Sequence, residues 1–130
     1  MFIINLTQHE ATADQKAEGV VDLPADQRKA LAEALTFEEL PSSEEITQRS
    51  NFIAALASMN GLGGDADEDP SPTAAMVGGA PWLMPALCRA LENSGIQPLF
   101  AFSTREAVEV EQDGQVVKTS RFIHRGFIAA

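Results

Sequence analysis

The chain has 130 residues, a length typical of one domain, and its 45% hydrophobic and 22% charged residues exclude wholesale disorder. Its apolar runs are far shorter than the roughly 20 residues that cross a bilayer, and its formal net charge of −10 argues against an extended DNA, RNA or membrane surface. The single cysteine, Cys88, excludes an intrachain disulfide and favours a buried structural thiol in a cytoplasmic protein without a secretory signal.

Short apolar runs alternate with helical patterns along the chain, which predicts strands that alternate with helices. The expected strands are the apolar runs at 2–6, 20–23, 74–77 and 96–102. The expected helices span 13–18 after the capping box of Thr12 and Gln15, 26–35, the stretch from the Ser42 N-cap to before Gly61, and the stretch from after Pro81 to Asn93. Two further runs, 108–110 and 116–122 around Asp113-Gly114, predict a closing β-hairpin.

This order predicts one α/β domain over residues 1–130, with a mostly parallel sheet, helices on both faces and a C-terminal β-hairpin. The run 2–6 should lie near the centre of the sheet, flanked by the strands that end at Leu23 and Val77, because it is apolar on both faces except at Asn5. Residues 60–73 contain three Gly, two Pro and four acids, which predicts a mobile acidic surface loop. The acids lack the EF-hand spacing, so a solvated connector explains this loop better than a calcium site.

Ligands bind such sheets in the crevice beyond the carboxyl ends of the parallel strands. Polar residues follow three of the expected strands directly: Thr7-Gln8-His9, Gly78-Gly79 and Ser103-Thr104-Arg105-Glu106. The distal part of the hairpin, His124-Arg125-Gly126, is expected nearby. The sequence therefore predicts a site for a small anion or a nucleotide among these segments.

Each of these segments also has a purely structural interpretation. Gly78-Gly79 before a helix suits an anion, because backbone N–H groups are accessible there, but a plain tight turn explains it as well. Arg105 can clamp a phosphate with two parallel donors, or it can pair with Glu106 or Glu109 at the surface. His9 can act as a general acid or base, can bind a ribose hydroxyl, or can lie exposed in a loop. Metal-ligand spacings, Walker motifs and nucleophile elbows are missing from the sequence, so we expect neither a metal nor a cofactor.

Three segments carry a resemblance to a known family. Residues 3–15 have an apolar strand, a Thr-x-His turn and a helix that begins T-x-x-Q. Residues 78–105 have a glycine turn, a long helix and a strand that ends in a small residue, Ser103-Thr104 and Arg105. Residues 113–127 have a hairpin with an F-x-H pattern and a final aromatic residue. In this order the segments, about half of the chain, resemble the small stand-alone CRISPR-associated Rossmann-fold (CARF-like) proteins, including the ring nucleases.

The resemblance implies a Rossmann-like fold and a homodimer that binds a cyclic oligoadenylate, a cyclic oligonucleotide second messenger of antiviral defence, across its two-fold axis. Some members of the family cleave this ring, and a metal-independent ring nuclease would use the 2′-hydroxyl of the ligand as nucleophile. The resemblance makes Arg105 and His9 candidate catalytic residues. The candidate ligand-binding residues are Thr7, Gln8, Gly78, Gly79, Ser103 and Thr104.

The strong acidity of the chain, and the lack of an attached nuclease or transcription-factor domain, favour a second hypothesis. A non-enzymatic accessory protein of phage or plasmid type could keep the fold and bind a protein partner instead of a nucleotide. Its acidic face, which extends to Asp69, would then contact a basic site on a complex that handles nucleic acid.

Overall fold

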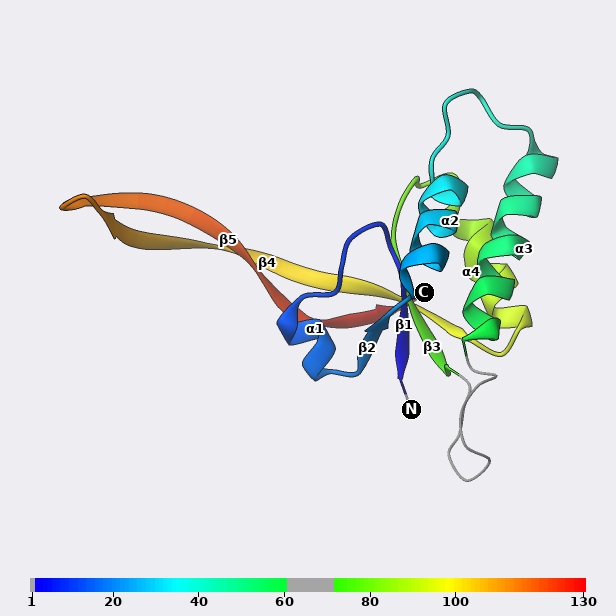
Figure 1. Ribbon diagram of the computed structural model, residues 1–130, viewed down its shortest axis with the longest axis horizontal. Helices are drawn as coiled ribbons and strands as arrows, with labels where there is room; N and C mark the ends of the chain where they lie inside the picture. Colours follow the sequence, from blue (N-terminus) through cyan, green and yellow to red (C-terminus); the bar gives the residue numbers. More distant parts are fainter. Residues whose placement is uncertain (1, 61–71) are drawn as a thin grey trace.

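The computed structural model describes residues 2–60 and 72–130, and within these ranges it consists of one sheet, four helices and a long two-stranded ribbon (Figure 1). In chain order the elements are β1 (Ile3–Leu6), α1 (Ala13–Ala17), β2 (Val20–Asp22), α2 (Ala25–Leu35), α3 (Ser43–Met59), β3 (Ala74–Val77), α4 (Met84–Asn93), β4 (Gln97–Gln112) and β5 (Gln115–Ala129). Most of the predicted acidic loop 60–73 lies outside the described residues. None of the helices in the described ranges is long and apolar enough to cross a membrane.

The sheet is mixed, with the strand order β2-β1-β3-β4-β5. Strands β1 to β4 run parallel, and β5 returns antiparallel to β4. Strand β1 pairs with β2 on one side and β3 on the other, with Ile4 opposite both Val21 and Ala75. The structure therefore confirms the predicted α/β class and the mostly parallel sheet. It also confirms that the first strand lies between the strands that end at Leu23 and Val77 in the prediction.

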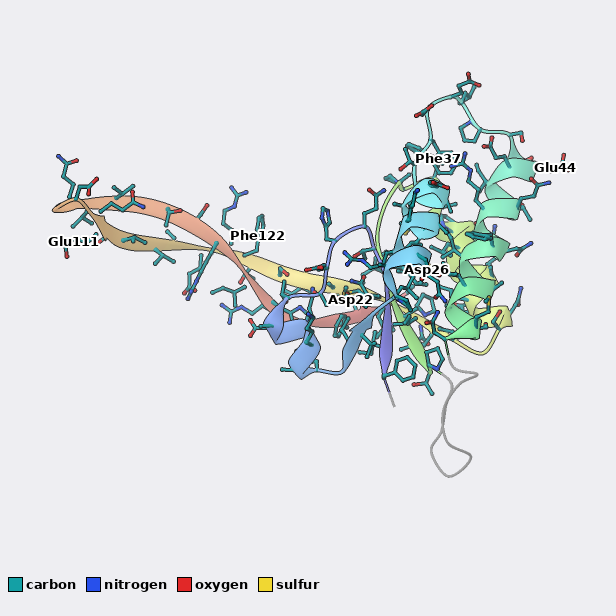
Figure 2. All side chains as sticks on the ribbon, in the orientation of Figure 1. Asp22, Asp26, Phe37, Glu44, Glu111 and Phe122 are labelled. Atoms are coloured by element: carbon teal, nitrogen blue, oxygen red, sulfur yellow. The ribbon has the colours of Figure 1, made fainter. Side chains whose placement is uncertain are left out.

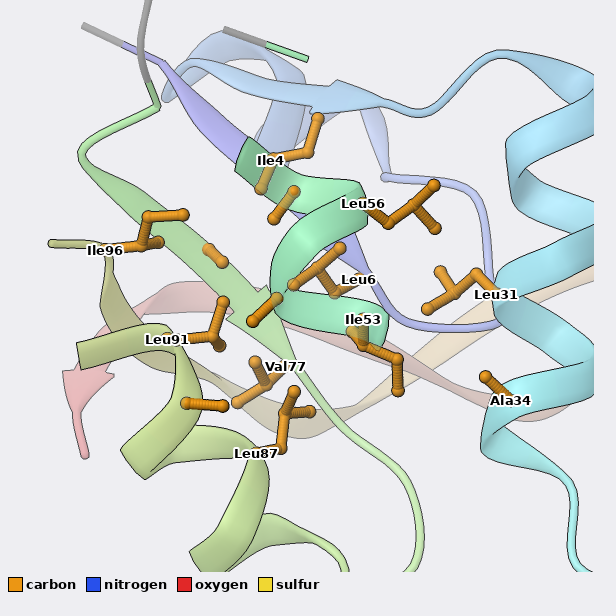
Figure 3. Packing of buried hydrophobic residues seen from close by; sticks show 14 of the residues in the cluster. Ile4, Leu6, Leu31, Ala34, Ile53, Leu56, Val77, Leu87, Leu91 and Ile96 are labelled. Atoms are coloured by element: carbon orange, nitrogen blue, oxygen red, sulfur yellow. The ribbon is translucent and has the colours of Figure 1, made fainter. Parts of the chain in front are cut away.

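The main core lies between one face of the sheet and the layer formed by α2, α3 and α4. Leu6, Ile53 and Leu87 are fully buried there (Figure 3). Full burial of one such side chain contributes about 1.5–3 kcal/mol. The other face carries a smaller cluster, and the short helix α1 lies on that side without burying any residue. The sequence predicts helices on both faces of the sheet, but the structure has three helices on one face and only the short helix α1 on the other.

Local capping signals account for where the helices begin. The side-chain oxygen of Thr12 accepts a hydrogen bond from the Gln15 backbone N–H, and the Gln15 side chain accepts one from the Thr12 N–H, which completes the predicted capping box. Ser42 caps α3 by accepting from the Glu45 N–H. Gly19, with φ of 101°, follows α1 in the left-handed region that the chain needs to turn into β2.

Cys88 lies in α4 and is half-buried. Burial raises the pKa of its thiol, and the negative charge of Glu92 raises it further. A thiol with a raised pKa is a poor nucleophile, which agrees with the structural role expected of Cys88.

The C-terminal hairpin is much longer than the sequence predicts. The expected strands 96–102 and 108–110 are parts of one strand, β4, which pairs with β5 as far as the Asp113-Gly114 turn. The pairing of β4 with β3 ends at Leu99, so the hairpin continues beyond the sheet as a two-stranded ribbon (Figure 1). We call residues 103–125 of this ribbon the arm. A β-bulge between Phe102 and Ser103 marks its base, where Arg125 has no partner in the register of β4.

Candidate ligand cleft

A cleft of about 370 Å³ opens at the carboxyl ends of β1 and β3, beside the part of β4 that leaves the parallel sheet at Phe100 and Ala101. Strands β2 and β3 lie on opposite sides of β1, so the connections that leave β1 and β3 diverge at this point of the sheet. Parallel sheets bind their ligands at such a switch in strand order. The lining residues are Thr7, His9, Glu10, Thr12, Gln15, Met76, Val77, Gly78, Phe100 and Ala101. Three of them, Thr7, His9 and Gly78, are predicted site residues.

Asn5 positions the loop that carries Thr7 and His9. Its side chain is buried within β1, and its Oδ1 accepts hydrogen bonds from the Thr7 N–H at 2.9 Å and from the Thr7 hydroxyl at 2.7 Å. Its Nδ2 donates to the His9 carbonyl oxygen at 2.7 Å and to Asp22 Oδ1 at 2.8 Å. Because all of these polar atoms are satisfied, the backbone from residue 7 to residue 9 is fixed at the mouth of the cleft.

Asp22, at the end of β2 and labelled in Figure 2, completes this network. Besides Asn5, it accepts a hydrogen bond from the Ala11 N–H at 3.0 Å, and Lys16 Nζ lies 3.9 Å from its Oδ2. Partial burial alone would raise the pKa of Asp22. The hydrogen bonds from Asn5 and Ala11, together with the positive charges of Lys16 and Arg28, outweigh burial and lower the pKa. The carboxylate is therefore a structural anchor for the loop.

The cleft combines hydrogen-bonding groups with apolar surface. Its polar lining residues include His9, Thr7 and Gln15. Its apolar lining residues include Phe100, which is partly buried against the main core, and Met76, which is buried on the other face of the sheet. No lysine or arginine of the described residues lines it. Its one lining carboxylate, Glu10, lies 3.1 Å from the guanidinium of Arg28 on α2. Such a lining suits a ligand with a flat ring and several hydrogen-bonding edges better than a bare anion.

The glycine pair is placed differently from the prediction. Gly78 lines the cleft, and a Cβ added to it would come within 3.5 Å of Thr7 Cγ2. Gly79 has φ of +143°, and a Cβ there would face Leu35 and Met84 in the helix layer. The helix expected after Pro81 is present but begins slightly later, because residues 80–83 form a turn and α4 begins at Met84 with Pro85 in its first turn. The glycines therefore do not present a helix N-terminus to the cleft.

The polar segment expected after the fourth strand lies inside β4 instead. Ser103, Thr104 and Arg105 are paired with β5 at the base of the arm and do not line the cleft. The Arg105 guanidinium lies over the ring of Phe122, 5.1 Å from its centroid, and none of the ion pairs among the described residues joins it to Glu106 or Glu109. Gln8 is exposed and is also absent from the lining.

The distance between Arg105 and the cleft follows from the geometry of the strand. Side chains alternate along β4, so Arg105 shares a face with Ala101, which lines the cleft. At a rise of about 3.4 Å per residue, the two Cα atoms are about 14 Å apart. Arg105 can therefore meet only a ligand that extends from the cleft along the arm.

His124 ties the base of the arm to α1. Its side chain is 3% exposed, its ring is tilted against Phe127 at 4.9 Å between centroids, and its Nε2 lies 3.2 Å from Glu18 Oε1. That contact lacks hydrogen-bond geometry, so both ring nitrogens are buried without a hydrogen-bond partner. The sequence places His124 near the site, whereas the structure packs it beneath α1 and away from the lining of the cleft.

Several residues of the cleft are missed by sequence reasoning. Glu10 and Phe100 carry no motif, and the pattern at Gln15 indicates only a helix cap. Asn5 does leave a signal, because it is the one polar residue in a strand that is otherwise apolar. A buried polar side chain in such a strand must find hydrogen-bond partners, and here those partners are the site loop and Asp22.

Comparison with known proteins gives one family. The model of the uncharacterized protein MJ1673 family matches residues 1–128, which is nearly the whole chain. No curated protein and no solved structure matches the chain.

Proposed function

The chain belongs to the uncharacterized MJ1673 family, and we propose that it binds a cyclic oligonucleotide second messenger, a cyclic oligoadenylate, in the cleft. The observation that carries this proposal is the position of Thr7 and Gly78. They come from two segments of the CARF-like resemblance and meet on either side of the switch in strand order. We describe the parallel part of the sheet as Rossmann-like on the same ground, because strand order β2-β1-β3-β4 is that of doubly wound nucleotide-binding sheets.

The lining of the cleft supports a nucleoside as the unit that is recognised. An adenine ring can pack on Phe100, while His9, Thr7 and Gln15 offer groups to its edge and to the ribose hydroxyls. One cleft has about the volume needed for one nucleotide, whereas a ring of several nucleotides needs more. We therefore propose a homodimer in which each copy contributes one cleft to the same ligand.

Cleavage of the ring needs only positioned side chains. The 2′-oxygen would attack the adjacent phosphorus while the bond to the 5′-oxygen breaks, which leaves a 2′,3′-cyclic phosphate and a 5′-hydroxyl. His9, which lines the cleft, would take the proton from the 2′-hydroxyl or return it to the leaving 5′-oxygen. Arg105 would stabilise charge on a phosphate only where the ligand reaches along the arm. As an enzyme, the protein would thus be a metal-independent ring nuclease.

Isothermal titration calorimetry with cyclic oligoadenylates of different ring sizes tests this function, with a linear oligoadenylate for comparison. We expect one ring size to bind, and we expect His9→Ala to weaken its binding about ten-fold. Gln8→Ala is the matched control, because Gln8 is next in the chain, exposed and outside the lining, and should leave affinity unchanged.

Incubation of the complex with a chelator present, followed by chromatography of the nucleotide, separates cleavage from binding alone. If none of the cyclic oligonucleotides binds, or if Gln8→Ala weakens binding as much as His9→Ala, the proposed site is wrong. In the first case the acidic accessory protein that binds a protein partner becomes the better explanation.

A further inference from the structure

The arm exposes apolar side chains that nothing in the described structure covers. On one of its faces lie Val110 and Val117, which are exposed, and Val108 and Ile123, which are half-buried; Phe102 adjoins them just below the base of the arm. We call these five residues the apolar face of the arm. They share one side because side chains alternate along β4, with Val110 opposite Val117 and Thr104 opposite Ile123. Phe102 is 49% exposed and Val117 is 42% exposed. Figure 1 shows the arm extending away from the helix layer, so no helix packs on this face.

A two-stranded ribbon of this kind is marginally stable in water on its own. Its backbone hydrogen bonds connect only the two strands, and its valine and phenylalanine side chains gain little while they face solvent. A second layer over the apolar face would bury these side chains and stabilise the extended pairing. The arm is therefore the part of the described molecule that most needs a partner.

Charge indicates which partner fits. Within residues 103–125 four Arg and Lys side chains balance four acidic ones, so the net charge of −10 resides on the rest of the chain. Two copies repel each other through their acidic bodies, but their arms can meet without that cost. Glu106 and Arg121 are cross-strand neighbours on this face, so a two-fold axis that passes near the pair can bring Glu106 of one copy against Arg121 of the other.

We propose that the apolar face of the arm is the contact between two copies of this chain, stacked face to face about a two-fold axis. This proposal names the contact surface of the homodimer proposed above. It rests on the proposed function only for the reason why a dimer would form, which is to share one ligand. The β-bulge at Arg125 and Gly126 twists the outer strand β5, which disfavours edge-to-edge pairing as the alternative. Phe100 and Ala101 line the cleft directly below the arm, so the second copy lies near the cleft mouth.

Sedimentation velocity at tens of micromolar protein, without nucleotide, tests the contact. We expect the wild-type chain to be a dimer and Val117→Glu to raise the dimer dissociation constant by at least ten-fold. Val116→Glu is the matched control, because Val116 is the preceding residue, is 68% exposed and lies on the opposite face of the same ribbon. It adds the same charge and should leave the dimer intact.

Far-UV circular dichroism of both variants must match the wild type, which is expected because both side chains are exposed. A monomeric wild-type chain would overturn the proposal, as would a Val117→Glu dimer of unchanged affinity. Equal dissociation by both variants would overturn the assignment of the contact to this face. Since no nucleotide is present, these results are independent of whether the cleft binds its ligand.

Discussion

The body of the molecule and its arm are stabilised in different ways. In the body, short strands of three or four residues are held by a helix layer that fully buries Leu6, Ile53 and Leu87. In the arm, strand segments about three times as long, 103–112 and 115–125, are held mainly by their own backbone pairing, with large apolar side chains in solvent. The comparison shows that the body buries its large apolar side chains within the described molecule, whereas the arm leaves several of its own in solvent.

The largest expected effect on stability comes from a comparison of one buried side chain in the body with one exposed side chain on the arm. Leu87→Ala removes a fully buried side chain from the contact of α4 with the sheet and should lower the free energy of unfolding by about 2–5 kcal/mol. Phe122→Ala removes a ring that is 71% exposed on the arm and contacts Arg105, so it should cost less than about 1 kcal/mol. Urea unfolding of both variants checks this. Equal losses would mean that the arm is as tightly packed as the body.

A smaller effect concerns the anchor of the site loop in the body. Asp22→Asn keeps an oxygen that can accept from the Asn5 amide and the Ala11 N–H, but it loses the negative charge that strengthens these bonds and faces Lys16 and Arg28. We expect a loss of about 1 kcal/mol at pH 7. Because folding lowers the pKa of Asp22, its contribution is present above the unfolded value of about 3.9 and is lost as the pH falls through the folded value. Wild-type stability should therefore fall on acidification more steeply than that of Asp22→Asn. Parallel pH profiles of the two proteins would contradict this assignment.

The body could be predicted from the sequence because its signals are local. The capping box at Thr12 and the N-cap at Ser42 place two helices, and the apolar run 2–6 gives the position of β1 between its neighbours. The length of the arm could not be predicted, since residues 103–107 are mostly polar and lack the apolar alternation of a strand. Their extended conformation depends on pairing with β5, which is a tertiary interaction.

The site shows the same division. Polar residues after β1 and β3 do meet in the cleft, because parallel strands bring their carboxyl ends to one edge of the sheet. The sequence predicts that the segment with Arg105 follows the end of a strand, but β4 continues through this segment into the arm. Phe100 lines the cleft because it follows Leu99, the last residue of β4 that pairs with β3. No sequence motif marks this position.

Amide chemical-shift mapping during titration with a cyclic oligoadenylate tests the central claim, that the cleft at the carboxyl ends of β1 and β3, beside Phe100 and Ala101 of β4, is the ligand site. We predict that the shifts concentrate at residues 7–15, 78 and 100–101, with any further changes along the arm. The groove between α2 and α3, lined by Glu33, Glu39 and Arg49, lies elsewhere and should stay unchanged. Shifts confined to that groove, or no shifts at all at millimolar nucleotide, would contradict the proposed site.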